Sequence, residues 1–175
     1  MSRDQKQGFT LYNLIFPVWL IWLMPPVVLL ILPANFLWDL LVTALTMRAF
    51  QVTDQKKKIR HVIVRVWLCG FLADLAGSVG LVLMSFVTPG RDFIGADWWY
   101  DKLMGPSVYN PLENPWAFLY VGLFILLSAV LIYVFNVRFC LKDAELEETK
   151  RKKLALSLAV FTAPYFFWVP ITWFA

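Results

Sequence analysis

One carboxylic acid, Asp74, lies in the middle of a long apolar segment and is the residue of this chain best placed to do chemistry. If that segment is a helix that enters a membrane at Val62, the rise per residue places Asp74 about 18 Å deep, near the middle of the bilayer. A carboxylate at that depth costs about 2.5 to 3.5 kcal/mol to insert, so it is a candidate for binding a proton or a cation. Two other interpretations stay open: a protonated Asp74 packed against a hydroxyl, and contact with a basic residue of a partner subunit.

The same depth argument gives Asp74 two candidate neighbours. Thr43 lies near the middle of an earlier apolar segment, and Ser128 lies about 18 Å into a later one when counted from its outer end. The sequence therefore predicts an intramembrane polar site made of Asp74, Thr43 and Ser128. Asp39 is predicted to lie near the outer end of its segment, where its side chain can reach the interface with water.

Small residues border Asp74 on one face of the predicted helix. They are Gly70, Ala73, Gly77 and Gly80. Small side chains let the backbone of a neighbouring helix approach closely within a membrane. We therefore expect this small-residue stripe to be the helix-packing face of the segment.

Motifs for catalysis or metal binding are missing from the sequence. It contains no phosphate-binding G-x-x-x-x-G-K-[ST] loop, no G-x-S-x-G nucleophile turn and no H-E-x-x-H zinc motif. The one histidine, His61, adjoins lysines and is expected to be solvated. Cys69 and Cys140 are expected to be unpaired, because they lie far apart and form no C-x-x-C motif. We predict no catalytic residue, metal site or cofactor, and an enzyme is the least favoured class.

Composition indicates a membrane protein. Of the 175 residues, 60% are hydrophobic and only 16% are charged, and the mean hydropathy is +0.65. A soluble domain is about half apolar and about a quarter charged. The net charge of +4 is confined to the ends of apolar segments. It therefore favours anionic lipid headgroups as partners, and nucleic acid is not expected.

The predicted fold is an all-α integral membrane protein, a small polytopic helix bundle in a single domain of residues 1–175. About 20 residues cross the hydrocarbon core as a helix. The predicted spans cover residues 11–32, 36–52, 62–88, 116–140 and 154–174. Pro33 marks the break between the first two spans, because proline lacks the amide that would continue the helix and disfavours a helical residue before it.

The polar stretches between the spans are predicted to be loops. Residues 89–115 are rich in turn formers and aromatics and are expected to lie on the outer surface, with a short interfacial helix near 97–104. Residues 53–61 and 141–153 are predicted cytoplasmic loops. In the second of these, Asp143 is expected to cap the next helix, and Glu148 precedes Lys152 at the spacing of a helical ion pair.

The distribution of basic residues orients the bundle. Lys and Arg collect on the cytoplasmic side of membrane proteins. With the amino terminus inside, 14 of the 16 basic residues fall on the cytoplasmic side, and only Arg91 and Lys102 lie outside. Two basic runs dominate and are the predicted contacts with lipid headgroups: Lys56, Lys57, Lys58 and Arg60 in one, and Lys150, Arg151, Lys152 and Lys153 in the other.

The weak point of this topology is the second span, which is short and carries Asp39 and Arg48. Residues 9–50 could instead cross once as a long tilted helix or return as a re-entrant hairpin. The bundle would then have four spans.

Two functions are compatible with these features. The leading hypothesis is a non-enzymatic membrane protein that acts through helix contacts as a subunit, assembly factor or regulator of a membrane complex. Its support is the small-residue stripe and the scarcity of polar residues for a transport path. The alternative is a small, oligomeric proton- or cation-coupled transporter or channel that uses Asp74. The size and the lack of N-x-[ST] acceptors in the outer loop favour a bacterial cytoplasmic membrane.

Overall fold

The computed structural model describes residues 25–90 and 92–173, and every regular element within those ranges is a helix. This confirms the all-helical class for the described part of the chain. The chain divides into two compact units, residues 1–34 and 35–175. The elements discussed below belong to the second unit, apart from the first part of α2.

Helix α2 covers Pro25–Ala49 and continues through Pro33. The predicted break between residues 32 and 36 is therefore wrong. Proline is tolerated inside membrane helices when neighbouring groups or local adjustments satisfy the freed backbone. Most of the predicted first span, residues 11–32, lies outside the described residues. The predicted second span corresponds to the second half of α2 and the turn that follows it.

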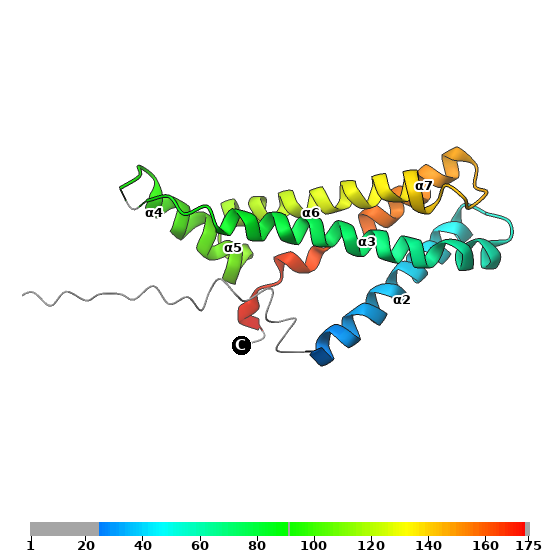
Figure 1. Ribbon diagram of the computed structural model, residues 1–175, viewed down its shortest axis with the longest axis horizontal. Coiled ribbons are helices and arrows are strands. Elements are labelled where there is room, and N and C mark those ends of the chain that lie inside the picture. The colour runs from blue at the N-terminus through cyan, green and yellow to red at the C-terminus, as the bar shows by residue number, and fades with distance from the viewer. Residues whose placement is uncertain (1–24, 91, 174–175) are drawn as a thin grey trace, which may run out of the picture. The chain divides into compact units, whose positions relative to one another are not determined.

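Helices α3, Gln55–Ser85, and α6, Pro115–Phe135, run side by side (Figure 1). A short π-helical turn, η4, continues α6 over Asn136–Cys140. Within the described residues, two stretches are long and apolar enough to cross a membrane, Gln55–Leu83 and Pro115–Cys140. They cover most of the predicted third span, 62–88, and all of the predicted fourth span, 116–140. The count of five spans stays a prediction.

Close contact between α3 and α6 occurs at two glycines. A Cβ atom at Gly77 would overlap the hydroxyl of Ser128, and a Cβ atom at Gly80 would overlap the ring of Phe124. The buried Ser128 hydroxyl also donates a hydrogen bond of 3.2 Å to the carbonyl oxygen of Ala73. The small-residue stripe of α3 is thus covered by α6 of the same chain along most of its length.

Helix α7 covers Glu148–Phe161 and is much shorter than the predicted span 154–174. Two 3-10 turns follow it, η5 at Tyr165–Trp168 and η6 at Ile171–Trp173. A single helix over 154–174 therefore does not form. Pro164 explains the stop, because proline disfavours a helical conformation at the residue before it. The apolar part of α7 is about 12 Å long at the usual rise, too short to cross a bilayer.

The outer loop contains more helix than expected. Short helical stretches cover Ala96–Trp98 (α4), Trp99–Met104 (η2), Gly105–Tyr109 (α5) and Pro111–Glu113 (η3). Two aromatic side chains tie this loop to the end of α3. Trp99 Nε1 donates to the carbonyl of Val87, and the Tyr100 hydroxyl donates to the carbonyl of Pro89, both at 3.1 Å.

The loop predicted at residues 141–153 differs from its prediction at Asp143. This residue does not cap α7, whose N-cap is Glu147. Its carboxylate instead forms a 2.9 Å ion pair with Arg65 of α3. The predicted pair of Glu148 and Lys152 is confirmed at 2.6 Å. The hydrogen bond from Lys152 lowers the pKa of the exposed Glu148 carboxyl.

The prediction that Cys69 and Cys140 are unpaired is wrong. The structure joins them in a disulfide, with Cα atoms 7.3 Å apart. They lie far apart in sequence, but the antiparallel arrangement of α3 and α6 brings the two positions together. A sequence distance of this kind says little about spatial distance in a helical hairpin.

Replacing Gly77 with leucine should lower the stability of the protein by about 1 to 3 kcal/mol, the usual cost of overpacking. The added side chain would have to displace Ser128 and the backbone of α6. Thermal unfolding of the purified protein in detergent measures the effect as a lower Tm. Leucine at the adjacent, exposed Ala76 is the matched control and should leave Tm nearly unchanged. Equal Tm values for the two variants would contradict the close contact.

Candidate intramembrane carboxyl site

Asp39 is buried between helices. The prediction that its side chain reaches the interface with water is therefore wrong. Its side chain is only 7% exposed. A Cβ atom at Gly70 of α3 would lie 3.6 Å from Asp39 Oδ2, so Asp39 occupies the space that a larger side chain at residue 70 would fill. Part of the small-residue stripe therefore accommodates a carboxyl group of α2.

Asp74 follows Gly70 by one helical turn on α3, and its carboxyl group interacts electrostatically with that of Asp39. One of its oxygens, Oδ1, is buried and has no hydrogen-bond partner among the described residues. Two carboxylates in an apolar environment cannot both carry charge at low cost. The pair is thus a place where a proton or a bound cation lowers the energy of the site.

Thr162 connects Asp39 to the end of α7. The Thr162 hydroxyl is hydrogen-bonded to the Asp39 carboxyl, and it also donates a 2.8 Å bond to the carbonyl of Leu158. A hydroxyl has a single hydrogen to donate. It can therefore donate to the Asp39 carboxylate or to the Leu158 carbonyl, one at a time.

Helix α7 ends beside this carboxyl pair. Trp38, the neighbour of Asp39 on α2, donates a 2.8 Å hydrogen bond from Nε1 to the carbonyl of Phe161. A helix carboxyl terminus carries partial negative charge from its free carbonyls. The end of α7 and the two acids together make a site that attracts a cation and repels an anion.

The predicted grouping of Asp74, Thr43 and Ser128 at one level stays a prediction. Thr43 is fully buried on α2, one turn from Asp39, and its hydroxyl has no partner among the described residues. Ser128 is also fully buried, but its hydroxyl bonds to the backbone of Ala73. Asp74 Oδ1 has no hydrogen-bond partner among the described residues, so the expected bond to a hydroxyl is not observed at that atom.

Sequence reasoning missed Asp39 and Thr162 as members of the site. The signal for Asp39 was present: α3 begins at Gln55, directly after the turn that ends α2, so the chain reverses direction there (Figure 1). Counting equally in both directions from Asp54 places Asp39 opposite Cys69 and Gly70. The error was to start the helix at Val62 and to treat residues 53–61 as a loop.

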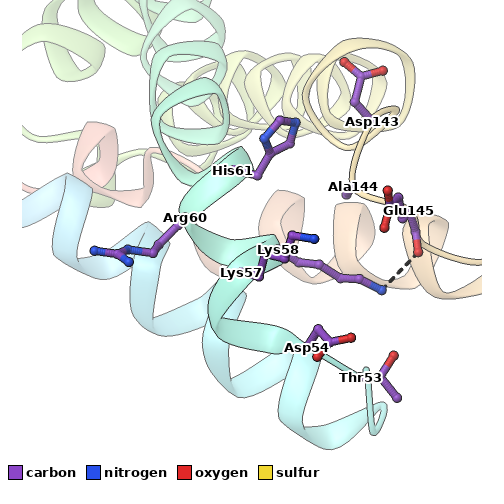
Figure 2. Close-up of a pocket in the computed structure, with 9 residues that line it drawn as sticks. All are labelled: Thr53, Asp54, Lys57, Lys58, Arg60, His61, Asp143, Ala144 and Glu145. Atoms are coloured by element: carbon purple, nitrogen blue, oxygen red, sulfur yellow. Dashed lines mark hydrogen bonds between the residues drawn. The ribbon is translucent and has the colours of Figure 1, made fainter.

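A second feature is a pocket of mixed charge at the start of α3, with a cavity of about 600 Å³ (Figure 2). The first turns of α3 supply Lys57, Lys58, Arg60 and His61 to its lining, and the loop before α7 supplies Asp143 and Glu145. Lys58 Nζ donates a 3.1 Å hydrogen bond to the carbonyl of Glu145. Acidic and basic groups are mixed here, so most of the charge is balanced locally.

The two predicted basic runs meet at this end of the hairpin. In the first run, Lys56, Lys57 and Arg60 are exposed and Lys58 is half-buried. In the second, Lys152 pairs with Glu148, and Lys153 Nζ lies 5.4 Å from the centre of the Phe50 ring. Lys150 and Arg151 are half-buried, and Arg151 Nε has no partner among the described residues.

Comparisons with known proteins add no family or relative. No protein-family model matches the chain, and no curated protein or solved structure gives a significant match. The site must be interpreted from its own residues.

Replacing Trp38 with phenylalanine should destabilise the protein by about 1 kcal/mol, the usual net value of one hydrogen bond. The variant leaves the Phe161 carbonyl at the end of α7 without its donor. Trp67 is the matched control, because its indole nitrogen has no hydrogen-bond partner among the described residues. Tm values in detergent should fall more for Trp38→Phe than for Trp67→Phe, and the opposite order would contradict the anchoring of α7 by Trp38.

Proposed function

We propose that this protein is an integral membrane protein that binds and carries protons or a small monovalent cation at the carboxyl pair of Asp39 and Asp74. One observation carries the proposal: a buried acid of α2, Asp39, and a half-buried acid of α3, Asp74, interact within a largely apolar set of helices. Ionisable residues inside a membrane are costly, and they commonly mark a path for protons or ions.

The end of α7 supports the same interpretation. Transporters often place their ion sites where a helix is interrupted within the membrane, since carbonyls at the end of a half-helix favour cations. Here α7 stops after Phe161, and Thr162 contacts Asp39. Thr43 and Thr162 add neutral oxygens close to the acids, which suits a proton or a cation equally.

A role through contacts with a partner subunit now has less support. Its main argument from the sequence was the small-residue stripe of α3. Gly77 and Gly80 are covered by α6, and Gly70 faces Asp39. The stripe therefore has neighbours within the chain and needs no partner to explain it. A subunit or assembly role remains the alternative if the carboxyl pair proves inert.

The proposed setting is the cytoplasmic membrane of a bacterium, with the mixed-charge pocket and both basic runs facing the cytosol. Basic side chains near a membrane surface gain about 1 kcal/mol each from anionic headgroups. The exposed side chains of Lys56, Lys57 and Arg60 are suited to such contacts. In this orientation α3 leads from the cytosol towards Asp74.

The test is ion flux in liposomes that contain the purified protein and a trapped pH indicator. Under a proton gradient, with charge compensated by valinomycin and K⁺, the wild type should acidify the lumen faster than protein-free liposomes do. Asp39→Asn and Asp74→Asn should each abolish the difference, because an amide keeps the shape of the carboxyl but cannot exchange a proton. The exposed Asp101 of the outer loop supplies the control, and Asp101→Asn should retain the flux.

Flux of Na⁺ and of K⁺ is also measured in liposomes under gradients of those ions, because the proposal includes a small monovalent cation. Size-exclusion profiles of the variants establish that they are folded. Wild-type flux equal to that of empty liposomes for all three ions would contradict the proposal and favour a role through helix contacts. Full flux in either intramembrane variant would also contradict it.

A further inference from the structure

The disulfide between Cys69 and Cys140 lies one residue before Gly70 on α3 and lines a cavity together with basic side chains of α3 and of the segment that ends α6. Cys69 belongs to α3, and Cys140 ends the turn that continues α6. Three basic side chains line the adjoining cavity of about 520 Å³: Arg65, Arg138 and Lys142. The carboxylate of Asp143 also lines it and pairs with Arg65.

The sulfur atoms differ in their access to solvent. Cys140 is only 1% exposed, and its sulfur lies 3.4 Å from the backbone carbonyl of Arg65. Cys69 is half-buried and lines the same cavity as the basic groups. Nearby positive charge stabilises a thiolate, which is the reactive form of cysteine. Cys69 is therefore the sulfur that a small thiol or disulfide reaches first.

This inference rests on the membrane orientation proposed above, in which the basic side chains that line this cavity face the cytosol. Disulfides are rare in that compartment, and those that form are usually transient and serve catalysis or redox sensing. A permanent structural crosslink is expected on the opposite, oxidising side. The position of the pair thus points to a bond that forms and breaks.

We propose that Cys69 and Cys140 are a reversible dithiol–disulfide site that exchanges with low-molecular-weight thiols and disulfides of the cytosol. In the oxidising direction, the Cys69 thiolate attacks one sulfur of the small disulfide and releases one small thiol. Cys140 then attacks the Cys69 sulfur and releases the second small thiol. The protein loses two electrons and two protons, and the small disulfide gains them as two thiols. The site needs neither Asp39 nor Asp74.

The experiment uses wild-type protein in inverted membrane vesicles, whose cytosolic side faces the medium. Vesicles reduced with dithiothreitol are washed and exposed to oxidised glutathione, which does not cross the membrane. Acid quenching, denaturation in SDS and labelling with a maleimide–polyethylene glycol then count the free thiols on a gel. Two adducts are expected before oxidation, none after it, and two again after renewed reduction.

Two controls make the outcome decisive. Right-side-out vesicles should keep both adducts, because oxidised glutathione then meets the opposite face. The Cys69→Ser variant should keep one adduct under the oxidant, because the buried Cys140 has lost its partner. Two adducts on oxidised wild type would overturn the proposal, as would oxidation only from the outer side. A shift to a disulfide-linked dimer on a non-reducing gel would overturn it too.

Discussion

The structure depends on how closely α3 can approach its neighbours. A helix can come near another only where it presents small residues, and α3 presents them at successive turns. Side chains of α6 pack directly against Gly77 and Gly80, and the Asp39 carboxyl of α2 packs against Gly70. One face of one helix therefore sets the contact with α6, the position of the carboxyl pair and the approach of Cys69 to Cys140. Larger residues on that face would move α6 away from α3, the Asp39 carboxyl away from Asp74, and Cys69 away from Cys140.

Burial of the acids imposes a second constraint. The carboxyl groups of Asp39 and Asp74 lie in surroundings that supply few polar partners, and Asp74 Oδ1 has none among the described residues. The cost of charge in such surroundings is high, so a proton or a cation is the natural occupant. Thr162 and the end of α7 add oxygen atoms without adding positive charge. These features distinguish the site from an ordinary structural hydrogen bond and are the basis of the proposed function.

The sequence predicted much of the local helical structure but little of which residues meet between helices. Apolar length identified the helices that became α3 and α6, and the spacing of small residues identified the face that packs. Proline alone does not predict where a helix ends. Pro33 predicts a break, but α2 continues through it, whereas α7 does end shortly before Pro164. The partners Asp39 and Cys140 depend on the turn positions and the antiparallel register. The predicted start of α3 at Val62 hid the approach of Asp39 to Gly70, and the separation of 71 residues hid the pairing of Cys69 with Cys140.

The central claim is that Asp39 and Asp74 act as one proton- or cation-binding unit. Infrared difference spectroscopy of the protein in liposomes, recorded as the pH is raised, tests it most directly because it observes the carboxyl C=O band itself. The account predicts a protonated-carboxyl band in the wild type that is altered in both Asp39→Asn and Asp74→Asn, since each acid senses the other. Absence of the band, or a band altered by one substitution and untouched by the other, would contradict the claim.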